Sequence, residues 1–278
     1  MNFSLIIPYH GNTEQLERLL ATVPQRDDLQ VITVYDELRR GAGWARNQGL
    51  TQSTGDYVFF ADSDDWFMPC ISELLDGMAG ESADIVYFNA TAKEEGSGKP
   101  SWRADRLNWI MFQNEKRREF LLRHTFTEPW CHIVKRSFIE KYHIRFDETP
   151  ILNDVAFSTQ CGYHAGSIAV KDLKAYCVCN HSGSTAKQRG DDQLQAYTEV
   201  MAKVNSFNRT HGIRYYHVRM LHPFFSCLSK GKWQMMCKCV KIIMKHDYSS
   251  IHLLWLLLTF PFYVIGWMYR KRCYHKCA

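Results

Sequence analysis

The chain has 278 residues, of which 46% are hydrophobic and 23% are charged, and its formal net charge is +5. This apolar content excludes a disordered or collagen-like chain, and the small net charge gives no indication of nucleic-acid binding. The length fits one large domain, or one domain with an appendage.

Short apolar segments alternate with helical patterns through the first third of the chain. The alternation predicts a mostly parallel sheet with helices on both faces, which is an α/β fold. Ligands bind such sheets at the carboxyl ends of the strands, and here these ends carry His10, Asp36 and the acidic segment 62–65. The expected strands are residues 3–7, 31–35, 57–61 and 85–88, and the expected helices are residues 13–22, 41–53 and 71–78.

The pattern is less regular after residue 90. The polar, glycine-bearing segment 91–106 is expected to be a loop, and the segment 151–161 carries Asn153 and Asp154. We expect helices over residues 128–142 and 193–206, and short strands over residues 144–146, 167–170 and 175–178.

The strongest chemical signal is GDYVFFADSDDWFMP, residues 55–69, where an apolar strand delivers Asp62, Asp64 and Asp65 to its carboxyl end. Three close carboxylates repel one another unless a cation is present. Mg²⁺ or Mn²⁺ prefers oxygen ligands and commonly also binds substrate phosphates. The segment therefore predicts a divalent-cation site. The alternative is structural, because Asp64 or Asp65 could cap a helix that starts near Pro69.

Seven sequence blocks follow one another over roughly residues 1–190. They are SLIIPYHGN, VITVYDE, GAGWARNQGL, GDYVFFADSDDWFMP, PWCHIVKRSFIEKYHIRFDE, ILNDVAFSTQCGYHAG and YCVCNHSGSTAK. In order and spacing the blocks resemble glycosyltransferase family 2, whose members use nucleotide sugars and have the GT-A fold. The resemblance implies a Rossmann-like α/β/α sandwich over residues 1–190, with a helical extension over residues 191–278.

The resemblance also implies roles for particular polar residues. Asp62 and Asp64 would hold Mn²⁺ or Mg²⁺, and Asp154 would be the catalytic base. Asp65 would face the sugar or support the ligands of the metal. The residues expected to bind the nucleotide sugar are Pro8, His10, Asp36, Arg46, Asn47, Asp62, Ser63 and Asp65.

The chain departs from the pattern of the family in four places. His10 stands where the family usually has tyrosine, and Gly11 where it usually has asparagine. Tyr35 replaces the first of two usual aspartates, and Asn153 replaces the usual glutamate before the base. His181 follows the last expected strand and is a further candidate for the metal, or an ordinary loop residue.

The C-terminal part of the chain is basic and apolar. Residues 251–268 carry no charge and approach the ~17–20 residues that a membrane-spanning helix needs. Three readings stay open: a helix in the membrane plane or re-entering it, a spanning helix, and a buried helix of a soluble protein. Lys238, Lys241 and Lys245 alternate with apolar residues, which is typical of a surface for anionic lipid headgroups.

The resemblance and the basic tail together predict an activity. We expect an inverting glycosyltransferase that moves a sugar from a nucleotide-diphosphate donor, of the UDP type, to a glycan or lipid-linked acceptor in surface polysaccharide biosynthesis. The alternatives are a non-catalytic, membrane-associated protein that binds nucleotide sugars or glycans, and a phosphate-processing enzyme that uses the same metal. The N-terminal residues MNFSLIIPYHGN have no signal-peptide pattern, so we expect a cytoplasmic protein on the inner face of the membrane.

Overall fold

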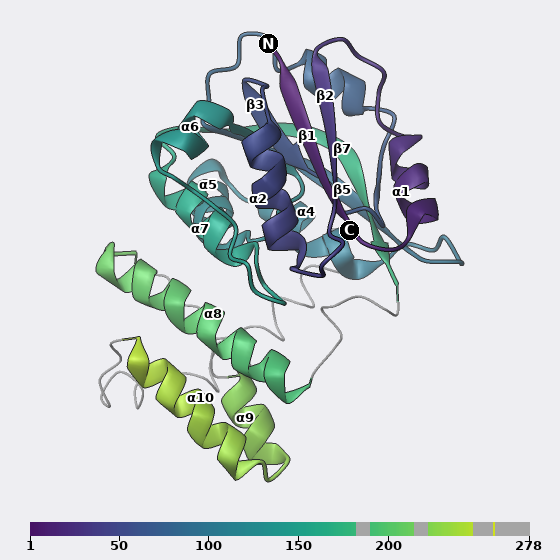
Figure 1. The fold of residues 1–278 in the computed structure, drawn as a ribbon. Coiled ribbons are helices and arrows are strands. Elements are labelled where there is room, and N and C mark those ends of the chain that lie inside the picture. The colour runs from purple at the N-terminus through teal and green to yellow at the C-terminus, as the bar shows by residue number, and fades with distance from the viewer. Residues whose placement is uncertain (182–189, 214–221, 247–257, 259–278) are drawn as a thin grey trace. The chain divides into compact units, whose positions relative to one another are not determined.

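The computed structural model describes residues 1–181, 190–213, 222–246 and 258 (Figure 1). These residues divide into two compact units. The first unit contains Met1–Glu148 and residues 153–181, and the second contains Thr149–Leu152 together with the described residues from 190 onward.

The first unit is built on one sheet of seven strands in the order β2-β1-β3-β6-β5-β7-β4. β1 is parallel to β2 and β3, and β5 is parallel to β7. β6 is antiparallel to both of its neighbours, and β4 is antiparallel to β7. The sheet is therefore mixed, where the sequence predicted a mostly parallel one. The strands are β1 Phe3–Tyr9, β2 Leu29–Tyr35, β3 Tyr57–Phe60, β4 Trp66–Phe67, β5 Ile85–Glu94, β6 His132–Lys135 and β7 Ile168–Asn180.

Helices cover the sheet of the first unit. A Cβ on Gly49 of α2 would meet Ile6 of β1 at 2.3 Å, and Phe157 of α7 packs on Phe60 of β3. Ile6 and Phe60 are register partners in adjacent strands, so α2 and α7 lie on the same face. The helices of this unit are α1 Thr13–Leu20, α2 Ala42–Gln52, α3 Ile71–Asp76, α4 Asp105–Met111, α5 Glu115–Thr125, α6 Arg136–Lys141 and α7 Val155–His164, with a 3₁₀ turn at Trp102–Ala104.

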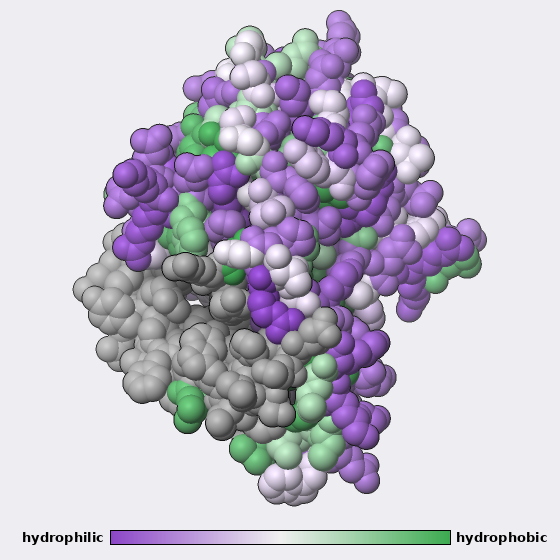
Figure 2. Space-filling model, turned by 90° about the vertical axis from the view of Figure 1, so that its left-hand side faces the viewer, coloured by the Kyte–Doolittle hydropathy of each residue, from purple (hydrophilic) through white to green (hydrophobic). Residues whose placement is uncertain are grey.

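The core lies on both faces of the central strands. Leu5, Ile6 and Ile7 of β1 are all fully buried, because neighbouring strands flank β1 and side chains pack on both of its faces. On the face opposite Ile6, Phe59 packs edge-on against Phe67 of β4. Burying a side chain of this size contributes roughly 1.5–3 kcal/mol. Figure 2 shows that the coloured part of one face of the first unit is mostly hydrophilic, with apolar residues only in small groups.

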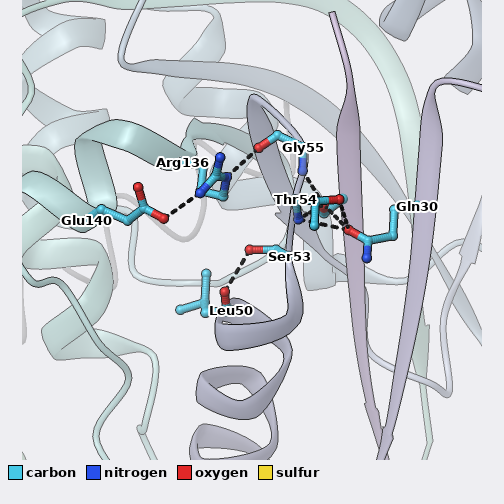
Figure 3. A network of polar contacts seen from close by, with 8 residues as sticks. Gln30, Leu50, Ser53, Thr54, Gly55, Arg136 and Glu140 are labelled. Atoms are coloured by element: carbon cyan, nitrogen blue, oxygen red, sulfur yellow. Dashed lines mark hydrogen bonds and ion pairs between the residues drawn. The ribbon is translucent and has the colours of Figure 1, made fainter.

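Hydrogen bonds, most of them between neutral groups, join the amino ends of β1, β2 and β3 (Figure 3). The Gln30 side-chain oxygen accepts from the Ser4 hydroxyl at 2.7 Å and from the Thr54 amide at 2.9 Å. The Ser4 hydroxyl oxygen accepts from the Gly55 amide at 2.9 Å, and Arg136 donates to the Gly55 carbonyl at 2.7 Å. This network, which we call the amino-end network, fixes the start of β3.

The segment 128–142 differs most from its sequence prediction. A helix was expected throughout, but His132–Lys135 form β6 and only Arg136–Lys141 form a helix. Ile133 and Val134 are fully buried between β3 and β5. Two β-branched side chains in that setting favour a strand.

Three further segments correct the sequence prediction. β5 continues to Glu94, so the expected loop over residues 91–106 begins as a strand. The two strands expected at 167–170 and 175–178 are one long strand, β7. Residues 144–146 are outside any strand, and Phe146 instead stacks on Phe157 with ring centres 4.0 Å apart.

The second unit contains three described helices, which are α8 Asp191–Thr210, α9 His222–Ser229 and α10 Trp233–Lys245. They share a small apolar cluster of Leu194, Cys227, Met235 and Cys239. Among the described residues, no helix is both long enough and apolar enough to cross a membrane. The apolar segment predicted at 251–268 lies outside the described residues, apart from Leu258.

Candidate active site

The carboxyl ends of β1, β2 and β3 lie side by side at one edge of the sheet. The register pairs Tyr9 with Tyr35 and Ile6 with Phe60. The residues that follow these strands, His10, Asp36 and Asp62, therefore lie along the same edge. This is the edge at which the sequence predicted a ligand site.

A tight turn after β3 gathers the three aspartates. The amide of Asp65 donates to the carbonyl of Asp62 at 3.0 Å, and ligand oxygens of Asp62, Asp64 and Asp65 all lie within 4.8 Å of one another. The next helix, α3, begins at Ile71 with Cys70 as its N-cap. The alternative reading of Asp64 or Asp65 as a helix cap is therefore wrong.

Burial and repulsion between carboxylates disfavour the charged forms of Asp64 and Asp65. Desolvation, followed by the charge of Asp62, raises the pKa of Asp64, and the hydrogen bond from His181 only partly opposes the rise. Desolvation, Asp64 and Asp62 raise the pKa of Asp65 well above its ordinary value. A divalent cation with oxygen ligands would relieve this repulsion, so the donor set fits Mg²⁺ or Mn²⁺.

Asp65 is turned into the protein. Asp65 is 2% exposed, and its Oδ2 accepts from the Tyr176 hydroxyl at 2.8 Å. Its Oδ1 accepts from the Cys179 amide at 2.7 Å. Both oxygens are therefore engaged by β7, and this geometry favours support of the neighbouring ligands over contact with a sugar.

Arg46 links the acidic turn to the start of α7. Its Nη2 donates to Asp62 Oδ1 at 2.6 Å, and its Nη1 donates to Asn153 Oδ1 at 2.7 Å. The guanidinium also lies over the ring of Phe146, 5.3 Å from its centre. Arg46 is almost fully buried, and its Nε has no hydrogen-bond partner among the described residues. The charge of Arg46 therefore offsets the Asp62 carboxylate, while its second amino group holds the Asn153 amide at the start of α7.

Close packing places Arg46 in this position. A Cβ on Gly43, one turn earlier in α2, would lie 2.0 Å from the backbone oxygen of Asp147 and 2.9 Å from Cβ of Asn153. Any larger residue would push α2 away from this segment. Glycine at position 43 therefore lets Arg46 reach Asn153.

Asp154 is the N-cap residue of α7, but its side chain makes no capping hydrogen bond. It is partly exposed and otherwise enclosed by protein, and this desolvation raises its pKa to about 7. Arg46 lowers the pKa, whereas Glu128 and Asp62 raise it. A carboxyl with a pKa near neutrality can accept a proton at physiological pH, which is the property of a general base.

The ends of β1 and β2 form a second part of the site. His10 Nδ1 is 2.8 Å from the carbonyl oxygen of Asp36, and the His10 ring is stacked against Tyr35 with centres 6.1 Å apart. The Asp36 carboxylate accepts from the backbone amides of Arg40 and Gly41, at 2.9 and 2.6 Å. Asp36 thus fixes the turn that leads into α2, and exposed Tyr35 offers a flat ring beside it.

Three of the predicted residues occupy supporting positions. Pro8 is buried within β1, and Ser63 is partly exposed between the aspartates. The Asn47 side chain donates to the Phe146 carbonyl at 3.0 Å and accepts from the Phe146 amide at 2.9 Å. Asn47 therefore holds the chain next to Arg46.

His181 joins the acidic turn from the end of β7. Its Nε2 is 2.5 Å from Asp64 Oδ2. Arg18 of α1 contacts the same residue from another side, because its Nη2 donates to the Asp64 carbonyl oxygen. The structure therefore brings His181 to the acidic turn, where it orients Asp64.

Several residues of the site were not singled out from the sequence. Tyr176 and Cys179 read as ordinary core positions of a strand, and Arg18 reads as an exposed helix residue. Glu128 was assigned to a helix, but it precedes β6 and its charge acts on Asp154. These residues join the site through contacts with the acidic turn or with Asp154, which the local sequence around them does not indicate.

Comparison with known proteins agrees with this arrangement. Residues 3–143 match the family described as glycosyl transferase family 2. The match extends over half of the chain, and the chain belongs to this family. Its fold is the GT-A α/β fold. Residues 1–349 of TarS from S. aureus, solved with UDP-GlcNAc, superpose with a TM-score of 0.60 at 17% identity, covering 87% of this chain and 72% of that one.

Two curated relatives carry glycosyltransferase names. EpsH of Bacillus subtilis (strain 168) is 25% identical over 195 residues, which is 67% of this chain and 55% of EpsH. YibD of Escherichia coli (strain K12), an uncharacterised glycosyltransferase, is 26% identical over 216 residues, or 70% of this chain and 58% of YibD. The chain therefore spans little more than half the length of these relatives.

Proposed function

We propose that the protein transfers a sugar from a nucleotide-diphosphate donor to a hydroxyl of a glycan or lipid-linked acceptor. A UDP-sugar is the first donor to test. The observation that carries this proposal is the connected network of Asp62, Arg46 and Asn153, which ties the acidic turn to the segment that bears Asp154. One rigid group can thereby hold both the diphosphate end of a donor and a base. The UDP-GlcNAc complex of TarS supports a donor of the UDP type.

Asp154 would act as the general base. The acceptor hydroxyl loses its proton to the Asp154 carboxylate as its oxygen bonds to the anomeric carbon. The bond from that carbon to the diphosphate breaks, and the electron pair leaves with the diphosphate. A single displacement of this kind inverts the anomeric configuration.

The acidic turn supplies the ligands for a divalent cation. Asp62 and Asp64 each use one carboxylate oxygen for Arg46 or His181, which leaves the other as a ligand. A bound Mn²⁺ or Mg²⁺ would neutralise negative charge that develops on the departing diphosphate. Buried Arg46 adds a fixed positive charge at the same place without reorganisation.

The ends of β1 and β2 would receive the nucleotide. The exposed ring of Tyr35 is suited to stacking, and the neighbouring His10 ring lies parallel to it. Asp36, whose oxygens already order the following turn, lies beside them. Stacking of this kind orients a base but does not by itself select the sugar.

We further propose that α10 lies on an anionic membrane surface, where a lipid-linked acceptor of surface polysaccharide synthesis would be found. Trp233 is 60% exposed and Met244 is 49% exposed, and helical spacing sets both on one side of α10. Exposed Lys238 and Lys241 lie on the adjoining side. An apolar edge beside a row of lysines is the arrangement that binds anionic bilayers.

The catalytic proposal is tested with a thermal-shift panel of nucleotide sugars in the presence of Mn²⁺, followed by product analysis. The correct donor raises the melting temperature, because stabilisation grows with ligand concentration over Kd. Acceptor-dependent transfer with inverted configuration is expected. Hydrolysis without an acceptor would indicate a phosphate-processing enzyme, and binding without turnover would indicate a non-catalytic protein.

The membrane proposal has a separate test. Sedimentation with phosphatidylglycerol vesicles is compared for the natural chain and for Lys238→Glu/Lys241→Glu. We expect the variant to lose at least about 2 kcal/mol of binding, since each lysine near an anionic surface contributes about 1 kcal/mol and each glutamate adds repulsion. The charge-matched control Lys99→Glu/Lys116→Glu changes exposed lysines of the first unit. Equal loss in both variants, or binding to neutral phosphatidylcholine, would contradict the role of α10.

A further inference from the structure

We propose that Tyr176 is a positioning residue of the cation site, whose hydroxyl holds the turn 62–65 in the shape that presents Asp62 and Asp64 to a divalent cation. The proposal deepens the proposed function and rests on it. Tyr176 does not contact the reacting atoms, because its whole side chain is buried beneath the turn.

The Tyr176 hydroxyl contacts both ends of the turn. It accepts a hydrogen bond from the Asp62 amide at 2.9 Å and donates one to Asp65 Oδ2 at 2.8 Å. The Cys179 amide, on the same strand, donates to the other oxygen of Asp65 at 2.7 Å. A single strand, β7, therefore holds the first and last residues of the turn while Asp64 projects between them.

The ring of Tyr176 is fixed from several directions, so the position of its hydroxyl is also fixed. Tyr176 is 0% exposed. Trp130 stacks on the ring with centres 5.9 Å apart and planes 15° apart, and Phe67 meets it edge-on at 5.4 Å. β7 also pairs with the two residues of β4 that follow the turn. The hydroxyl consequently acts as a fixed point rather than a mobile partner.

Loss of this hydroxyl would alter the ligand geometry. Phenylalanine at position 176 would keep the packing but leave the Asp62 amide and one Asp65 oxygen without their partner. A buried group left unsatisfied in this way favours rearrangement of the turn that carries it. Groups that orient metal ligands typically change metal affinity by about 10–100-fold when removed.

The test compares Tyr176→Phe with Tyr57→Phe, a matched control. Tyr57 is likewise buried, and its hydroxyl donates to the Ala83 carbonyl at 2.9 Å, at the opposite end of β3. Mn²⁺ binding by electron paramagnetic resonance, donor KM, kcat and urea unfolding are measured for both. We expect Tyr176→Phe to bind Mn²⁺ about 10–100-fold more weakly, with turnover restored by excess Mn²⁺. Tyr57→Phe should lose stability without a change in Mn²⁺ affinity.

Natural affinity for Mn²⁺ in Tyr176→Phe would overturn the positioning role while leaving the proposed function in place. Absence of Mn²⁺ binding by the natural chain would overturn both the cation site and this role. If Tyr176→Phe fails to fold, Trp130→Phe tests the same idea, because it loosens the ring and keeps the hydroxyl. Its Mn²⁺ affinity should fall in the same direction by a smaller factor, and an unchanged affinity would count against the role.

Discussion

The two ends of β3 are built in opposite ways. At the amino end, the amino-end network joins Ser4, Gln30 and Thr54 by hydrogen bonds between neutral groups. At the carboxyl end, ligand oxygens of three aspartates lie within 4.8 Å of one another, and Asp62 is paired with Arg46. One end of the strand has its polar groups matched, whereas the other concentrates negative charge.

This contrast indicates which end serves stability and which serves chemistry. Paired neutral groups in a sheet edge stabilise the fold by about 0.5–1.5 kcal/mol for each bond. Desolvated carboxyls with raised pKa values, such as Asp64 and Asp65, cost stability when charged. Perturbed groups of this kind cluster at functional sites. The carboxyl end therefore retains a strained charge arrangement that a bound cation would relieve.

The largest expected effect comes from removing the base at the carboxyl end. Asp154→Asn keeps the size of the side chain but cannot accept the acceptor proton, so kcat should fall by about 10²–10⁴-fold. Donor binding should be nearly unchanged. The matched control, Asp56→Asn, alters an exposed carboxylate at the amino end that accepts from the Asn2 amide at 2.8 Å. Unchanged turnover in Asp154→Asn would remove the residue from this role.

Breaking the link at Arg46 sharpens the contrast further. Arg46→Met leaves Asp62 and Asn153 without their shared donor. Because the Asp62 side chain is 34% exposed, the loss of stability should be smaller than the ~3–5 kcal/mol typical of a fully buried pair. The pKa of Asp154 should also rise, because Arg46 now lowers it. Urea unfolding and the pH–rate profile measure the two effects. Arg46→Lys retains the charge and should recover part of the natural pH–rate profile. If both variants lose the same stability and neither shifts the pH–rate profile, Arg46 acts through packing alone.

The pH dependence of stability tests the charge arrangement directly. The folded-state pKa of Asp154 is about 7, above its ordinary value, so the folded state holds this proton more tightly than the unfolded chain. Its stabilising contribution is complete below about pH 4 and is lost as pH rises to 7. Because Asp154 is partly exposed, we expect it to contribute about 1–3 kcal/mol to the free energy of unfolding, which is less than the full pKa shift would give. Arg46, Glu128 and Asp62 are the charges that act on it.

Chemical denaturation at pH 5 and pH 8 checks this sign. The natural chain should lose more stability between the two values than Asp154→Asn, which has no proton to release. The raised pKa values of Asp64 and Asp65 act in the same direction, and Mn²⁺ should reduce their part of the slope. A natural chain that becomes more stable toward pH 8 without metal would contradict the assignment.

The sequence predicts the acidic end of β3 well because its signal is local. Apolar residues 57–61 followed by Asp62, Asp64 and Asp65 indicate a buried strand that ends in a charged turn, and this arrangement is present. The edge shared by His10 and Asp36 follows from the same βα alternation. Both inferences need only the order of strands along the chain.

Other features depend on contacts that no local pattern records. The Tyr176 hydroxyl reaches a residue 111 positions earlier in the chain, and nothing around it distinguishes it from a core tyrosine. β6 was expected to be helical because its four residues adjoin a helical pattern, and burial between two strands decides their conformation. Tertiary packing, rather than propensity, accounts for these differences.

The smallest expected effect lies at the amino end. Gln30→Ala removes an oxygen that accepts from Ser4 and Thr54, and water can replace part of these bonds because Gln30 is partly exposed. The free energy of unfolding should therefore fall by about 1 kcal/mol. Mn²⁺ affinity and kcat should stay within about twofold of the natural values, because the amino-end network lies at the other end of β3 and, within the described part of the chain, shares no hydrogen-bond partner with the aspartates. Urea unfolding, Mn²⁺ binding and turnover are measured on the same preparation. A parallel fall in turnover would mean that the two ends of β3 are energetically coupled, and the division between a stabilising end and a reactive end would then be wrong.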